Sequence, residues 1–206
     1  VGRWATRRAA TAGHNVTALV RPSTPFEAPV GVVVRRGSAL EPDFLSEAIQ
    51  GQDAVISCIG SQRTNPRNPW SPLRQPLHAA ELTARALVTA MTGDSGRRVV
   101  AISAGGVGDG IEAANAMIRW MTRHTTIGAM YADLDAMEQV LRASSVDWLA
   151  VRAVTLINAA PSNRTKVLRR YRLHSVVGRA DVAAWMVQSL VDPRPISDRT
   201  PLIGWW

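Results

Sequence analysis

The sequence predicts an α/β fold with a doubly wound parallel sheet, because helix-like and strand-like segments alternate along the whole chain. At the start, a helix-like stretch from Trp4 to Ala12 closes at Gly13, and a strand-like run over residues 14–20 follows at once. Helix and then strand is the second half of a βαβ unit. We therefore expect one domain over residues 1–206 in which the first strand and its glycine-rich loop are missing.

The next elements continue the alternation. The β-branched run from Val30 to Arg36 predicts a strand. Pro42 is favoured at a first helical position and predicts a helix that ends near Gly51. The apolar run over residues 53–59 predicts a buried strand that Gly60 closes.

Four prolines exclude regular structure from residues 61–76, which we expect to form a loop. A long helix should follow, with one apolar face formed by Ala80, Ala84, Leu87, Val88 and Met91. Residues 97–103 read as the next strand, and a flexible glycine turn over residues 104–108 comes after it.

The last part of the chain is expected to hold, in order, helices at 111–123 and 130–141, a strand at 147–153, a helix at 181–190 and a strand at 200–206. Residues 154–178 break the alternation. We expect them to form a small insertion over the carboxyl ends of the strands.

Composition limits the classes of function. The net charge is +8, and the basic residues are all arginine except Lys166. Because they are scattered along the chain, they favour a solvated surface over a nucleic-acid binding face. An anionic cofactor or substrate is a further explanation of the charge. No apolar run reaches the roughly 18 residues of a membrane span, so no membrane partner is expected. Cys58 is the one cysteine, so an internal disulfide is excluded and a reducing, cytoplasmic location is expected. The oligomeric state is open.

Ligands of doubly wound sheets bind beyond the carboxyl ends of the strands. Arg21 follows the first visible strand and, in place of an acidic ribose acceptor, offers donors suited to a 2′-phosphate, so NADP(H) is expected over NAD(H). Ser38 and Ala39 follow the second strand, where the turn could pass under an adenine or simply cap the next helix.

Small residues follow the third and fourth strands. Cys58, Ile59 and Gly60 would let a ribose or nicotinamide lie against the backbone, with Cys58 a buried apolar residue rather than a nucleophile. Ser103 and Ala104 would lie near the nicotinamide and substrate, although Ser103 could also only satisfy backbone groups at the start of its loop.

Other polar residues carry weaker signals. The histidines show no metal-ligand spacing, so no metal site is expected. Asp133, Asp135 and Glu138 could do acid and base work, but a solvated helix face is the simpler interpretation.

Several stretches together resemble the atypical short-chain dehydrogenases with an NAD(P)H-binding domain, a group that includes biliverdin/flavin reductases and NmrA-like proteins. They are residues 14–21, 53–57, 100–103, 137–144, 147–152 and 178–184. The resemblance covers nearly the whole chain and implies a Rossmann-like fold that binds a nicotinamide dinucleotide.

The chain also departs from that family. The family's Gly-x-x-Gly-x-x-Gly turn survives only as Gly2, which the resemblance matches to its last glycine, and Ala153 follows Arg152 where the family commonly has proline. Many short-chain dehydrogenases use Tyr-x-x-x-Lys for proton transfer, but here Tyr131 is followed four residues later by Asp135. We expect Tyr131 to keep a pKa near about 10 and not to act as an acid.

The resemblance implies an NAD(P)H-dependent oxidoreductase that passes hydride to a flat conjugated small-molecule acceptor, with Ser103 positioning the reacting rings. Such acceptors need no strong enzyme acid, because solvent supplies the proton. The alternative is an NmrA-like protein that senses the cofactor without turnover.

Overall fold

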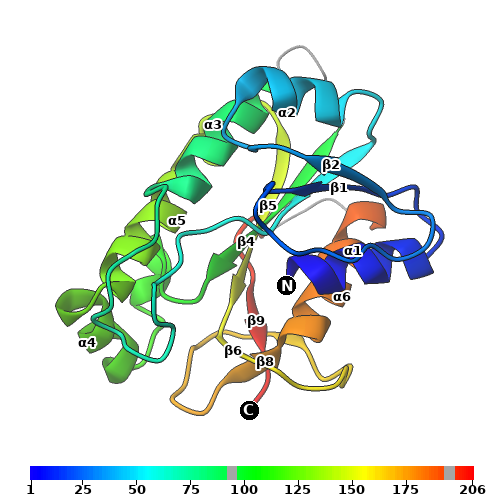
Figure 1. The fold of residues 1–206 in the computed structure, drawn as a ribbon. Coiled ribbons are helices and arrows are strands. Elements are labelled where there is room, and N and C mark those ends of the chain that lie inside the picture. The colour runs from blue at the N-terminus through cyan, green and yellow to red at the C-terminus, as the bar shows by residue number, and fades with distance from the viewer. Residues whose placement is uncertain (92–96, 193–197) are drawn as a thin grey trace.

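The structure is a computed structural model, and it describes residues 1–91, 97–192 and 198–206. Its largest sheet has the order β3-β4-β5-β9-β7. Strands β3 (Ala54–Ser57), β4 (Arg98–Ala104), β5 (Asp147–Ala153) and β9 (Leu202–Gly204) are parallel, and β7 (Lys166–Val167) is antiparallel to β9. The predicted α/β fold with a mainly parallel sheet is confirmed (Figure 1).

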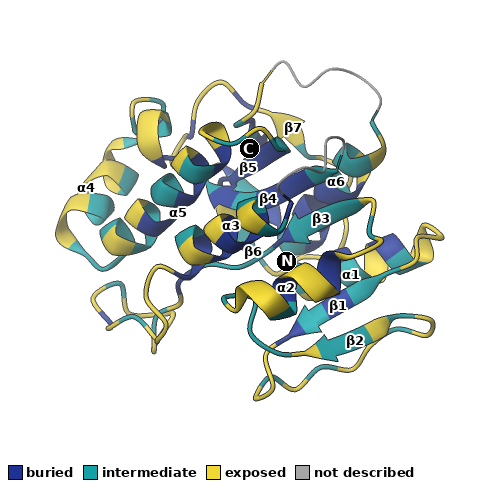
Figure 2. Cartoon of the chain, turned by 90° about the horizontal axis from the view of Figure 1, so that it is seen from above, coloured by how far each residue is buried: buried dark blue, intermediate teal, exposed yellow. Residues whose placement is uncertain are grey.

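Helices cover both faces of this sheet. On one face, α2 (Pro42–Ile49), α3 (Ala79–Ala90) and α5 (Ile127–Arg142) pack on Val99 and Ala101 of β4. On the other face, α6 (Arg179–Val191) packs on Val100 of the same strand, and α1 (Gly2–Thr11) packs on α6. Burial of successive β4 residues on opposite faces is the pattern of a doubly wound sheet, and Figure 2 shows the buried residues gathered between the layers.

Strands β1 (Thr17–Val20) and β2 (Val33–Arg36) form a separate parallel pair. Neither β1 nor β2 is hydrogen-bonded to β3 in the described part of the chain. Both strands are shorter than predicted. The N–H of His14 still bonds to the Ala9 carbonyl at the end of α1, and Gly31 turns the chain with a φ of 81° just before β2.

The chain from 105 to 126 differs from the single helix predicted at 111–123. It forms a short 3₁₀ helix η1 (Gly108–Ile111) and a separate helix α4 (Ala116–His124). Asn115 separates them because its side chain accepts a hydrogen bond from the Ile118 N–H at 3.1 Å, which is an N-cap.

The predicted insertion contains β6 (Thr155–Ile157), β7 and β8 (Val176–Gly178), with β6 paired to β8. Leu168 and Tyr171 anchor it in the core. Among the described residues, no helix is both long and apolar enough to cross a membrane.

Candidate functional site

The predicted site residues other than Gly2 lie at or just beyond the carboxyl ends of β1, β2, β3 and β4. The first turn of α1 belongs to the same region, since a Cβ added at Gly2 would lie 3.5 Å from the Cβ of Cys58. The N–H groups of Gly2 and Arg3 have no acceptor inside the helix, because they belong to its first turn. Free N–H groups at a helix N-terminus form a binding place for an anion such as a pyrophosphate.

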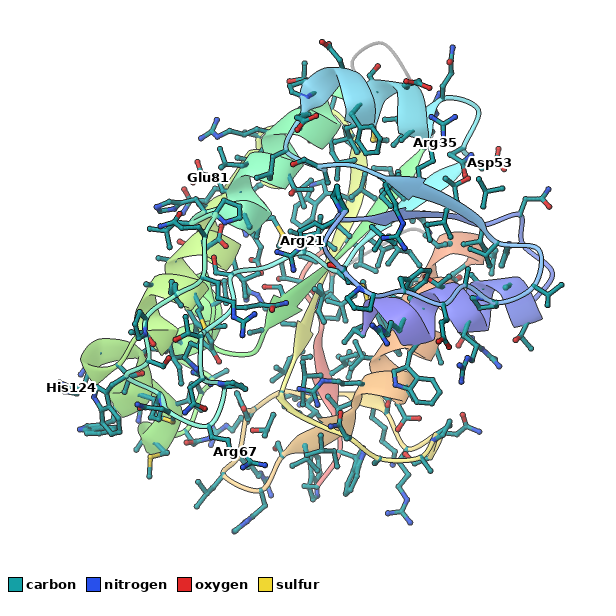
Figure 3. All side chains as sticks on the ribbon, viewed as in Figure 1. Arg21, Arg35, Asp53, Arg67, Glu81 and His124 are labelled. Carbon is teal, nitrogen blue, oxygen red and sulfur yellow. The ribbon has the colours of Figure 1, made fainter. Side chains whose placement is uncertain are left out.

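Arg21 is exposed just beyond β1, near the centre of Figure 3. The neighbouring arginines Arg35 and Arg36 both have hydrogen-bond partners within the protein. Arg36 donates to the carbonyls of Pro22 and Thr24, and Arg35 forms an ion pair of 3.0 Å with Glu47. Arg21 makes no side-chain hydrogen bond or ion pair with any residue that the structure describes, so its guanidinium is free to bind an anion.

Ser38 forms the predicted turn into α2. Its Oγ accepts a hydrogen bond from the Leu40 N–H at 3.2 Å, and its carbonyl accepts one from Glu41. A Cβ at the preceding Gly37 would lie 2.4 Å from the Phe44 ring, so the turn before Ser38 and Ala39 needs glycine. The Ser38 hydroxyl still has its proton to donate.

Cys58, Ile59 and Gly60 form the backbone edge after β3. Burial raises the pKa of the Cys58 thiol to about 11, which keeps it protonated and agrees with an apolar rather than a nucleophilic residue. A Cβ at Gly60 would meet nothing nearer than Leu134 at 3.9 Å, so this position is open.

Ser103 is turned into the protein. Its buried Oγ donates to Glu138 Oε1 at 2.6 Å, so the hydroxyl proton points away from the strand edge. The following turn runs through Ala104 to Gly105, whose N–H bonds to the Ala153 carbonyl at 2.8 Å. A Cβ at Gly105 would lie 2.7 Å from Leu202 and 2.9 Å from Tyr171, so only glycine fits there.

Glu138 is the centre of a buried polar network that the sequence did not predict. It is 1% exposed, and its carboxylate also accepts from Arg152 Nε at 3.0 Å and Nη2 at 2.6 Å. Arg152 in turn reaches Asp109 of η1 at 2.7 Å. The network therefore ties β4, β5 and α5 to the glycine turn after β4.

Asp133 is the second buried carboxylate of α5. It accepts hydrogen bonds from the Ser61 hydroxyl at 2.7 Å and from the N–H groups of Ala80 and Glu81, which begin α3. The prediction of a solvated face was thus wrong for Asp133 and Glu138. Their polar partners come from distant segments, and helical spacing alone carries no sign of them.

The prediction that Tyr131 keeps an ordinary phenol pKa was wrong. Burial raises the pKa of its phenol above the ordinary value instead of leaving it near that value. The ring lies against the glycine turn, since a Cβ at Gly106 would be 3.3 Å from it. Asp135 accepts from Gln139 at 2.8 Å, and Lys166 lies in β7, the edge strand beyond β9.

The Pro-rich segment 61–76 has no helix or strand and is joined to the start of α5. Thr126 Oγ1 donates to the carbonyls of Pro69 and Ser71, and Trp70 Nε1 donates to the His124 carbonyl at 3.0 Å. These bonds hold the segment against the junction of α4 and α5. The described residues contain no group of three His, Cys, Asp or Glu that could hold a metal ion.

The chain belongs to the family of NAD(P)H-binding domains, whose model matches residues 1–193. The residues available at the strand ends fit such a cofactor, with free helix N–H groups at Gly2 and Arg3 and an unpaired Arg21 guanidinium. No curated protein matches the sequence.

Solved structures share the fold at low identity. A short-chain dehydrogenase/reductase from Veillonella parvula in complex with NADP is 17% identical with a TM-score of 0.74, covering 98% of this chain and 88% of that one. ChuY, an anaerobillin reductase from Escherichia coli O157:H7, is 19% identical with a TM-score of 0.73 and coverages of 97% and 89%. A candidate NADH-flavin reductase from Streptococcus pneumoniae is 17% identical with a TM-score of 0.72 and coverages of 100% and 94%.

Proposed function

We propose that the protein is an NADPH-dependent reductase that transfers hydride to a flat conjugated acceptor of the flavin or biliverdin type. The observation that carries the proposal is the chemistry of the strand edge. It offers groups that bind anions and, at Gly60, a backbone with no side chain over it. The hydroxyl groups of Ser103 and Tyr131 are not arranged to deliver a proton. The reductases among the similar structures support the same class.

Two groups of this chain would bind the phosphates of the cofactor. The N–H groups of Gly2 and Arg3 would hold the pyrophosphate, and Arg21 would hold the 2′-phosphate with a charge-assisted pair of hydrogen bonds. When bound, the nicotinamide supplies the hydride. The open backbone at Gly60 leaves room for flat rings against the end of β3.

Proton delivery is the step in which this chain differs from dehydrogenases that use a tyrosine and lysine pair. Tyr131 has Asp135 in place of the lysine, and burial raises its pKa, so nothing stabilises the phenolate that proton donation leaves behind. The Ser103 proton is held by Glu138. A conjugated acceptor spreads the charge of the added hydride and can take its proton from solvent, so it suits this edge better than an isolated carbonyl.

The test is oxidation of NADPH by the purified protein with FMN, biliverdin or a soluble quinone as acceptor. Turnover with at least one of them is expected. Arg21→Glu should weaken NADPH binding by about 10- to 100-fold and NADH binding far less, because it removes a charge-assisted contact worth roughly 1.5 to 3 kcal/mol.

Arg8→Glu is the matched control, since Arg8 is exposed on α1 and the charge change is the same. Equal losses of NADPH and NADH affinity in Arg21→Glu would refute the 2′-phosphate role of Arg21.

A second candidate is a cofactor-sensing protein without turnover, as in the NmrA-like branch. The engaged Ser103 hydroxyl favours it, because the residue is held in a structural network. Tight NADPH binding with no oxidation by any of the acceptors would select this function over the reductase.

A further inference from the structure

A stretch of the insertion is strongly basic and has no acidic residue. From Trp148 to Ala180 the sequence contains no Asp or Glu. Within it, the exposed cationic side chains are Arg164, Lys166, Arg169, Arg170 and Arg172. None of these five forms an ion pair with a residue that the structure describes, so their charge is not neutralised locally.

Exposed apolar side chains lie among these cations. Val167 is 59% exposed and Leu173 is 61% exposed, and Trp206, 65% exposed, lies beneath the Arg172 guanidinium at 5.1 Å from the ring centre. We call these three and the five cationic residues the basic-apolar patch. The segment therefore presents exposed aliphatic and aromatic surface beside its exposed charge.

The backbone holds the patch in place. Leu168 and Tyr171 are buried and anchor the segment, and the Tyr171 N–H bonds to the Ala113 carbonyl at 2.9 Å. The Ser175 N–H bonds to the Arg172 carbonyl and so closes a turn with Leu173 at its tip. Arg169 and Arg170, between the two anchors, are exposed. The segment lies at the end of the molecule where the C-terminus lies and away from α2 and β2 (Figure 1).

We propose that the basic-apolar patch binds the surface of membranes that contain anionic phospholipids. Lysine and arginine side chains are attracted to anionic headgroups, and aliphatic and tryptophan side chains gain by entering the boundary between headgroups and acyl chains. A single-stranded nucleic acid would satisfy the arginines and stack on Trp206, but it offers nothing to the aliphatic side chains of Val167 and Leu173. The proposal does not depend on the reductase activity.

The experiment is co-sedimentation of the protein with vesicles of equal parts phosphatidylcholine and phosphatidylglycerol, and with vesicles of phosphatidylcholine alone. Binding is expected only to the anionic vesicles. Arg169→Gln/Arg170→Gln should lower the partition coefficient by about 25-fold, at about 5-fold for each charge removed. Arg7→Gln/Arg8→Gln, which removes two exposed charges from α1, should lower it far less.

Leu173→Ser separates the two parts of the patch, because it leaves the charge unchanged and should still weaken vesicle binding. Thermal unfolding and NADPH binding of each variant check that the fold persists. Equal losses in the two arginine pairs would overturn the proposal. So would a Leu173→Ser protein that binds vesicles normally, or a single-stranded oligonucleotide that binds the patch more tightly than the vesicles.

Discussion

Replacing Glu138 by glutamine should destabilise the fold strongly, because it removes the negative charge that holds a buried arginine. Glu138 is 1% exposed and Arg152 is 5% exposed, and two hydrogen bonds of 3.0 and 2.6 Å join them. Breaking a buried ion pair by removing one partner costs about 3 to 5 kcal/mol. Arg152 keeps Asp109 at 2.7 Å, so we expect the lower end, about 3 kcal/mol.

That loss is a large part of a typical folding stability of about 5 to 15 kcal/mol, so it should be plain in urea unfolding followed by circular dichroism. Gln139→Ala, in the same turn of α5 but exposed, should change the free energy of unfolding by about 0.5 kcal/mol or less. The double variant Glu138→Leu/Arg152→Met should recover most of the stability, because no buried charge is left unpaired. A cost below about 1 kcal/mol for Glu138→Gln would contradict the assignment of Glu138 as the ion that neutralises Arg152.

Two further predictions concern Tyr131 and Asp147. Tyr131→Phe should keep most of the reductase activity, because no lysine lowers the phenol pKa and burial raises it; loss of about three orders of magnitude in turnover by a folded variant would show proton donation by Tyr131 instead. For Asp147, burial opposes the shift, but hydrogen bonds from Arg98 at 2.7 Å and Arg199 at 2.6 Å hold its pKa below the ordinary value. A carboxyl group whose pKa is lower in the folded than in the unfolded state stabilises the fold at any pH above its unfolded-state pKa of about 3.9. That stabilisation is lost as the pH falls through the folded-state pKa. Urea unfolding should therefore find Asp147→Asn less stable than the native protein at neutral pH, with the difference shrinking below about pH 4; a difference independent of pH would refute this role.

The order and type of the main elements followed from the sequence because each is a local pattern. Residues 147–153 are an uninterrupted apolar run apart from Asp147 and Arg152, and the strand forms over just those residues. The first strand was predicted three residues too early, because the sequence gives no sign that the His14 N–H still bonds to the end of α1. The helix predicted at 111–123 begins five residues later, at Ala116, because the N-cap at Asn115 was not recognised.

The buried carboxylates could not be predicted, for a different physical reason. Glu138 and Asp133 are separated in the sequence from Ser103 and Ser61, and their burial depends on how α5 packs against β4, β5 and the start of α3. A polar residue on a helix is exposed unless a distant partner satisfies it, and the identity of that partner is a property of the tertiary structure. The site residues proposed at the strand ends remain predictions, but their positions follow from the parallel order of the strands.

The arrangement of charge at the strand edge argues for a particular kind of substrate. Two of the three carboxylates of α5 are directed inward, with Glu138 paired to Arg152 and Asp133 bonded to Ser61 and the start of α3. Arg21 is exposed, and under the proposed function it and the α1 N-terminus would face the bound dinucleotide. An edge of this kind would attract an anionic dinucleotide, and Asp133 and Glu138 are held in buried contacts, so neither is free to take a proton from an alcohol. Reduction of an electron-poor conjugated ring, which needs hydride and a solvent proton, therefore suits the proposed site better than oxidation of an alcohol, and a search for activity should begin with NADPH and such acceptors.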